Sequence, residues 1–199
     1  RSTPSASWNL TVLEDATIWS LAPVGRGTLA VGAGSGTRGL VALVDATGQT
    51  TILVRSTSDD NLGTSVAWGG SHGCLLAGAP SHANGRGAVH LLEVSPSSAI
   101  SRSRIIPAPS SLPLDSSFGA SVAWLDTTQS VSRIAVGASD ADAVVLLWLG
   151  PDDSVPRQSL SLSPLSLPRL FPRFGNTSTP LRFGASVARF GPGSVAVGV

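Results

Sequence analysis

The residues of this chain that could do nucleophilic or metal chemistry include three histidines and one cysteine. His72, His82 and His90 lie close in sequence to Cys74. Imidazole nitrogens and a thiolate could together hold a metal ion or form a Cys–His nucleophile. However, Cys74 begins an apolar run where a small buried residue belongs. The histidines lie in glycine-rich turns or in an alternating strand, so we interpret all four residues as structural.

Paired carboxylates are the second group of residues that could take part in catalysis or bind a metal ion. The pairs are Asp59 with Asp60, Asp140 with Asp142, and Asp152 with Asp153. Each pair lies beside turn residues, where Asp is favoured because its side chain bonds the local backbone. We therefore expect solvated turns. Asp140 and Asp142 directly follow a recurring glycine phrase and are the first residues to mutate if a cation is found.

The segment Gly34–Gly39 has the spacing G-x-G-x-x-G, which is typical of dinucleotide-binding loops when a helix follows. Here the next residues, 40–44, are a run of Val, Leu and Ala that favours a β-strand. The sequence therefore predicts a hairpin turn at this segment.

An internal repeat is the most informative feature, because a missed repeat leads to the wrong fold. Two phrases recur in a fixed order along the chain. The first, two apolar residues followed by Gly-Ala or a close variant, contains Gly32, Gly78, Gly137 and Gly198. The second, Phe-Gly-Ala-Ser-Val-Ala in its full form, contains Gly63, Phe118, Gly119, Phe183 and Gly184. Such an ordered recurrence indicates repeated structural units.

Each unit is predicted to contain four short β-strands, of which the two phrases supply the first two. The third runs, 39–44, 87–92 and 143–149, are almost continuously apolar, which is typical of strands covered on both faces. The runs 49–55 and 101–106 are more polar and suit an outermost strand. Four antiparallel strands form one blade of a β-propeller, so we predict an all-β propeller.

The repeated glycines are predicted to mark close approaches between blades, because glycine tolerates positive φ and close backbone contact. The Phe beside the second glycine would act as an apolar plug. Trp68 and Trp124 occupy the same repeat position. We therefore expect these indoles to pack between blades, in preference to forming a surface that stacks on sugars or peptides.

These phrases resemble FG-GAP repeats, the blades of the integrin α-subunit propeller and of related surface proteins. The resemblance extends from about Ala16 to Val199 and is strongest over 118–139. It implies a seven-bladed ring, commonly extracellular, that is used in adhesion or assembly. About three and a half blades are present, whereas a ring needs about four to eight to close. We therefore expect either more sequence after Val199 or a ring completed by another chain.

The resemblance also suggests a division of the chain, with a lead-in at residues 1–15 before the first blade. The blades are predicted at 16–58, 59–115, 116–180 and, in part, 181–199. Blade 1 departs from the family pattern, because 17–21 replaces the Phe-Gly phrase.

Many FG-GAP repeats carry an Asp-rich calcium loop between the two phrases, since calcium requires several converging oxygen ligands. The corresponding segments here contain one carboxylate, Asp126. We therefore assign no metal site and expect no cofactor in these residues. Asp126, Asp140 and Asp142 are kept as weak metal candidates, and calcium would belong to blades outside this sequence.

Composition limits the partners and the compartment. The 13 basic and 12 acidic residues leave a net charge of +1, so no strong field attracts nucleic acid. No apolar stretch is long enough to span a membrane. Asn9 and Asn176 begin N-glycosylation sequons, which fit a secreted protein. The Pro- and Ser-rich stretches 107–113 and 161–180 are predicted to be loops between blades.

The sequence favours a non-catalytic extracellular propeller that mediates adhesion or assembles a cell-surface structure. We find no catalytic constellation in these residues and predict that the chain is not an enzyme. Its partners would be proteins or the remainder of its own propeller. Two alternatives remain: an accessory propeller of a larger secreted hydrolase, since FG-GAP units also resemble those of a secreted phospholipase, and an intracellular scaffold.

Overall fold

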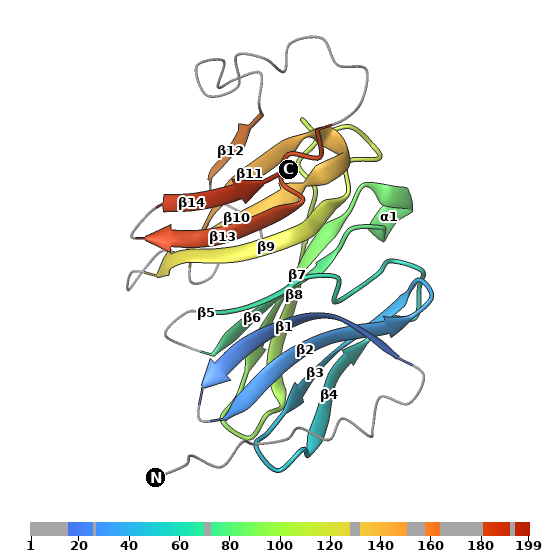
Figure 1. Cartoon of the computed structure of the whole chain (residues 1–199), viewed down its shortest axis with the longest axis vertical. Helices are drawn as coiled ribbons and strands as arrows, with labels where there is room; N and C mark the ends of the chain where they lie inside the picture. Colours follow the sequence, from blue (N-terminus) through green and yellow to red (C-terminus); the bar gives the residue numbers. More distant parts are fainter. Residues whose placement is uncertain are drawn as a thin grey trace.

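The structure is a computed structural model of the chain (Figure 1). It describes residues 16–25, 27–69, 73–127, 132–150, 158–163, 181–191 and 194–199. Its described elements are mainly β-strands, arranged in three four-stranded sheets and one two-stranded sheet. No helix within these ranges has the length and hydrophobicity that a membrane crossing requires.

We call the four sheets blades 1 to 4, in chain order. Blade 1 contains β1 (Thr17–Gly25), β2 (Thr28–Ser35), β3 (Arg38–Val44) and β4 (Thr50–Arg55). Blade 2 contains β5 (Val66–Gly69), β6 (Cys74–Ala79), β7 (Ala88–Val94) and β8 (Ile100–Pro107). Blade 3 contains β9 (Phe118–Thr127), β10 (Ser132–Ala138), β11 (Ala143–Leu149) and β12 (Gln158–Leu162). Blade 4 contains β13 (Ser186–Gly191) and β14 (Ser194–Gly198).

Within each blade every strand pairs antiparallel with the next strand along the chain. Short connections join the strands, including the turn α1 (His82–Gly85) and the 3₁₀ turn η2 (Ser139–Ala141). In α1, Ala83 and Asn84 have positive φ values of 51° and 61°, so this segment is a tight turn of mixed handedness. The result is a repeated meander.

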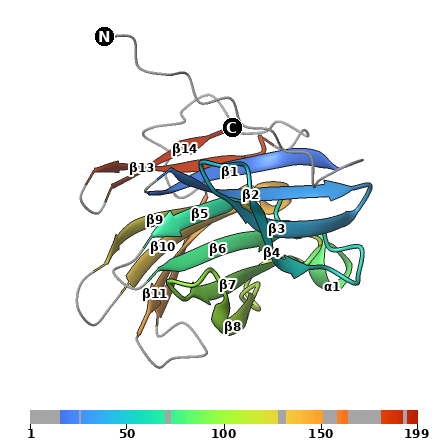
Figure 2. The ribbon, with the colours of Figure 1, turned by 90° about the horizontal axis from the view of Figure 1, so that it is seen from below.

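The first strand of each blade lies beside the first strand of the next blade, in the order β1, β5, β9 and β13. Figure 2 shows the later strands of blades 2 and 3 following in order away from these inner strands. This radial arrangement of meanders is that of a β-propeller. The predicted all-β fold with four-stranded antiparallel blades is therefore confirmed.

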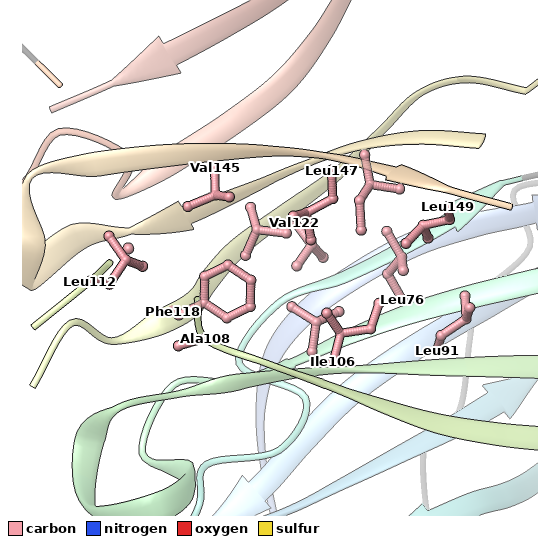
Figure 3. Packing of buried hydrophobic residues seen from close by; sticks show 14 of the residues in the cluster. Leu76, Leu91, Ile106, Ala108, Leu112, Phe118, Val122, Val145, Leu147 and Leu149 are labelled. Atoms are coloured by element: carbon pink, nitrogen blue, oxygen red, sulfur yellow. The ribbon is translucent and has the colours of Figure 1, made fainter. Parts of the chain in front are cut away.

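The hydrophobic core lies between the blades. Figure 3 shows Leu76 and Ile106 of blade 2 facing Val122 and Leu147 of blade 3, with Phe118 among them. Phe118 is completely buried. Because each inner blade is covered on both sides, its central strands must be apolar on both faces. Most residues of β7 and β11, in the inner blades 2 and 3, are accordingly buried. The six residues Gly39–Val44 of β3, in blade 1, are also all buried, as the continuous apolar run predicts.

The outermost strands are less buried, as their composition predicts. β4 is half-buried along most of its length, and β8 exposes Ser101, Arg102 and Ser103. The Pro-rich stretch 107–113 begins at the last residue of β8 and continues as a loop. The second Pro- and Ser-rich stretch begins within the edge strand β12, and most of it lies outside the described residues.

Candidate functional site

The junction between successive blades carries a repeated hydrogen bond, which we call the serine–glycine lock. A serine hydroxyl on one blade donates to the carbonyl oxygen of the glycine at the entrance of the next blade. The three bonds are Ser20 to Gly63 at 2.8 Å, Ser65 to Gly119 at 2.9 Å, and Ser121 to Gly184 at 2.8 Å. The recurring phrases therefore meet in pairs across the blade junctions.

The glycine of the first phrase makes room for this lock. A methyl group added at Gly137 would overlap the backbone carbonyl of Gly184. The same holds for Gly32 against the carbonyl of Gly63, and for Gly78 against that of Gly119. Because backbone atoms cannot move aside as a flexible side chain can, any other residue would push the blades apart.

The glycine of the second phrase adopts a conformation that other residues avoid. Gly63, Gly119 and Gly184 have φ values of 91°, 98° and 90°. The residue before each glycine fills the core, since Leu62, Phe118 and Phe183 are at most 3% exposed. The apolar plug and the close approach predicted for this phrase are therefore both present.

Two aspartates hold the entrance loops of the blades. The carboxylate of Asp142 accepts hydrogen bonds from the backbone N–H groups of Leu181 and Phe183, at 3.2 Å and 3.0 Å. The carboxylate of Asp60 accepts one from the N–H of Leu62 at 3.1 Å and one from the Ser58 hydroxyl. Bonds of a carboxylate to backbone N–H groups are stronger than neutral ones. Both residues fix the position of the apolar plug that follows.

The burial of Asp60 corrects one expectation from the sequence. Asp60 is only 5% exposed and is not a solvated turn residue. Its neighbour Asp59 is exposed and lies 3.5 Å from the Arg38 guanidinium, as expected for a surface carboxylate. The two residues differ because local hydrogen bonding draws the Asp60 side chain toward the buried backbone of the entrance loop.

The three weak metal candidates lie at two separate places in blade 3. Asp126 forms a bidentate ion pair with Arg133 across β9 and β10. The hydrogen bonds from Arg133 hold the pKa of the Asp126 carboxyl below its usual value. Asp140, which accepts a hydrogen bond from the Ser117 hydroxyl, and Asp142 follow the other end of β10. Among the described residues, no three acidic, histidine or cysteine side chains gather as metal ligands would.

An open cavity of about 660 Å³ lies among the inner strands of all four blades. Each blade contributes to its wall the residue three positions after the lock serine or its equivalent: Pro23, Trp68, Trp124 and Arg189. The indole N–H of Trp124 donates to the backbone carbonyl of Ala67 in blade 2, at 3.1 Å. Trp124 thus packs between blades, as predicted from its repeat position.

Within the described residues, Cys74 forms no nucleophilic pair with His82 or His90. Cys74 lies opposite Glu93, whereas His90 lies opposite Ala77, further along β6. Burial raises the pKa of the Cys74 thiol, which disfavours the reactive thiolate. The rings of His82 and His90 approach edge to face, with centroids 6.5 Å apart.

Burial lowers the pKa of His90, and its Nε2 atom has no hydrogen-bond partner within the described part of the chain. A half-buried imidazole whose pKa is lowered in this way is a structural residue with a latent sensitivity to acid.

The G-x-G-x-x-G segment forms the hairpin between β2 and β3, with Gly34 opposite Gly39. No helix follows it, so the predicted hairpin is confirmed. Several sequence features lie outside the described residues: Asn9, His72, Asp152, Asp153, Asn176 and the lead-in 1–15.

The lock serines are the functional residues that the sequence reasoning did not identify. A signal for them was present, because a serine stands two positions after the entrance glycine of each second phrase, whether that glycine follows Leu or Phe: Ser65, Ser121 and Ser186. Ser20 occupies the same position in blade 1, although Ile18 replaces the glycine there.

Comparison with known proteins supports the fold. No protein-family model matches this sequence, and no curated protein matches it. Among solved structures, the chain is similar to one titled "Streptogramin B lyase structure", with a TM-score of 0.53 and 12% sequence identity. The match covers 86% of this chain and 44% of that one, so the chain spans less than half of that β-propeller. At this identity the similarity shows the fold alone, and the chain is a set of β-propeller blades.

Proposed function

We propose that this chain is a non-catalytic propeller module of the FG-GAP type that serves in adhesion or in assembly of a cell-surface structure. The serine–glycine lock is the observation that carries this proposal. Ser20, Ser65 and Ser121 bond to neighbouring blades, and Asp142 holds the next entrance loop. These hydroxyl and carboxylate groups therefore hold the blades in a rigid framework, which is what a binding scaffold requires.

Such a framework would display loops for partner proteins, and the loop between β8 and β9 is one candidate. Leu114 in this loop is 72% exposed. Binding residues are disproportionately found on loops that a rigid scaffold positions, and Leu114 would be the apolar contact residue of this loop. Leu160, on the edge strand β12, is a matched exposed leucine outside the loop.

The adhesion role is tested with the natural protein immobilised on a surface to which cells of its source are added. We expect cells to attach, and Leu114→Asp to reduce attachment at least about tenfold while Leu160→Asp does not, because an anchor residue contributes about 2 kcal/mol. No attachment of cells to the wild-type surface would contradict adhesion, and equal loss in both variants would contradict the role of this loop.

The cell-surface location rests on the sequons at Asn9 and Asn176. The intact mass of the natural protein should fall after treatment with an amidase that removes N-linked glycans. Each occupied asparagine should then be found as aspartate. Unmodified asparagine at both positions would remove this support and favour the intracellular scaffold.

The alternative, an accessory propeller of a secreted hydrolase, is favoured by the open cavity among the inner strands. The natural protein should be assayed against phospholipid vesicles and simple esters. Hydrolysis that persists through purification to a single species would replace the adhesion proposal with this alternative. Absence of turnover, together with cell attachment, supports the adhesion module.

A further inference from the structure

Blade 4 presents a face that no described part of the chain covers. On β13 this face comprises Ser186, Ala188 and Phe190, all exposed, and Phe190 is 82% exposed. On β14 it comprises the exposed Ala196 and the half-buried Gly198. We call this surface the open face. The opposite side of blade 4 carries Val187, Val195 and Val197, which pack against blade 3.

The open face repeats, position by position, the face of blade 3 that blade 4 covers. Counting from the lock serine and the repeat glycine, the equivalent residues in blade 3 are Ser121, Ala123, Leu125, Ala135 and Gly137. All five residues are buried, and a methyl group at Gly137 would meet the backbone of blade 4. The same surface is therefore an established interface one blade earlier.

The parts of the lock are also in place on the open face. A methyl group added at Gly198 would meet the Ser186 hydroxyl, just as one at Gly137 would meet the Ser121 hydroxyl. At Gly137 the same methyl would also meet the carbonyl of Gly184, whereas at Gly198 only atoms of Ser186 lie within reach. The serine donor and the space for a carbonyl are thus both present.

We propose that the open face receives a further blade of the same type, which presents to Ser186 the carbonyl of a glycine at positive φ. The phrase of that partner would be an apolar residue, Gly, a small residue and Ser. The apolar residue would cover Ala196, as Phe183 packs in one cluster with Ala135. This inference rests on the proposed assembly role, for which it names a partner.

Blade 1 of a second copy does not fit this chemistry. Ile18 stands at its glycine position. In the three occupied locks a methyl on the entrance glycine would lie 3.1 to 3.3 Å from the Cα of the preceding repeat glycine. A β-branched residue also avoids positive φ. A head-to-tail dimer therefore cannot form this lock.

The test compares three alanine variants of the natural protein, in whatever assembly it forms: Gly198→Ala, Gly137→Ala and the control Gly191→Ala. A methyl at Gly191 meets no other residue. Hydrogen exchange of the amides of 186–198 reports locally on the open face. We expect Gly198→Ala to reduce protection there about tenfold or more, which corresponds to about 1.4 kcal/mol. Gly191→Ala should leave it nearly unchanged.

A double variant distinguishes a clash of the new methyl group with the partner's backbone from a clash with the neighbouring Ser186 hydroxyl. Gly198→Ala combined with Ser186→Ala removes the contact between the new methyl and the Ser186 hydroxyl. Loss of protection that persists relative to Ser186→Ala alone supports an external carbonyl. Recovery to the level of Ser186→Ala alone, or a Gly198→Ala variant that behaves like Gly191→Ala, would overturn the proposal.

The mass in solution identifies the occupant. We expect Gly198→Ala to leave the oligomeric mass unchanged while protection falls. A homodimer that Gly198→Ala dissociates would show that a second copy covers the face, which contradicts the proposed partner. Because these readouts do not involve glycans or cell attachment, failure here is distinguishable from failure of the adhesion proposal.

Discussion

The hydroxyl group of Ser121 donates a hydrogen bond of 2.8 Å to the carbonyl oxygen of Gly184, which lies 63 residues further along the chain. This bond joins blade 3 to blade 4, and equivalent bonds join blades 1 to 2 and 2 to 3. Each is possible only because a repeat glycine without a side chain lies beneath the carbonyl. The first consequences to test concern these glycines.

Gly137→Ala is expected to destabilise the fold by about 3 kcal/mol, because the new methyl overlaps the backbone carbonyl of Gly184. Gly191→Ala is the control and should change the free energy of unfolding by less than about 0.5 kcal/mol. Urea denaturation monitored by tryptophan fluorescence measures both. Equal urea midpoints for the two variants would show that the junction accommodates the methyl group at Gly137 without loss of stability.

Phe118→Ala should cost about 3 to 5 kcal/mol, because Phe118 is completely buried between blades 2 and 3. Phe190→Ala removes the same side chain from a site that is 82% exposed. Where no partner covers that site, the cost should be below about 0.5 kcal/mol. The same denaturation experiment applies, and a small effect of Phe118→Ala would contradict its role as the plug.

Asp142→Ala is expected to lower the free energy of unfolding by about 1 to 3 kcal/mol, because two backbone N–H groups lose their acceptor. Hydrogen exchange should show the loss at the amides of Leu181 and Phe183. The exposed Asp115 provides a matched control, since Asp115→Ala removes a surface carboxylate. If the amides exchange equally in both variants, Asp142 does not hold the entrance loop.

Acidification should destabilise the protein through His90. Burial lowers the His90 pKa in the folded state, although the nearby Asp60 charge opposes this and His82 adds to it. In the window between the lowered value and the ordinary 6.5, the unfolded chain therefore binds more protons. The free energy of unfolding then decreases as pH falls through that window.

His90→Leu should weaken this pH dependence, because the variant removes the group whose proton affinity differs between the two states. Chemical denaturation at about pH 7.5 and about pH 5 measures the change, and an NMR titration should place the His90 midpoint below its ordinary value. Parallel losses of stability in the wild-type protein and in the variant would contradict this origin.

The fold could be predicted from the sequence because its signals are local. The apolar run 143–149 already shows that both faces of β11 are covered, and the recurrence of Gly78 and Gly137 shows that the units repeat. Neither inference requires knowledge of which residues meet in space. The hairpin at Gly34–Gly39 was predictable for the same reason, since the residues that follow it favour a strand.

The chemistry of the junctions was less accessible, because it joins residues that are a whole blade apart. Nothing near Ser65 in the sequence indicates that its acceptor is Gly119. Asp60 looks like Asp59 in composition and turn context, yet one is buried and the other is exposed. The hydrogen bonds of Asp60 to Ser58 and Leu62 distinguish the two residues, and they become visible only when the buried entrance loop is in place.

The locks connect residues 43, 54 and 63 positions apart, so each joins a blade only to its immediate successor. Contacts of this range can form in order as a chain is synthesised, because each lock requires only the next blade along the chain. Blade assembly can therefore follow translation from the amino terminus. Each new Phe-Gly entrance loop would then bury the face of the preceding blade, which limits the time that face is available for aggregation.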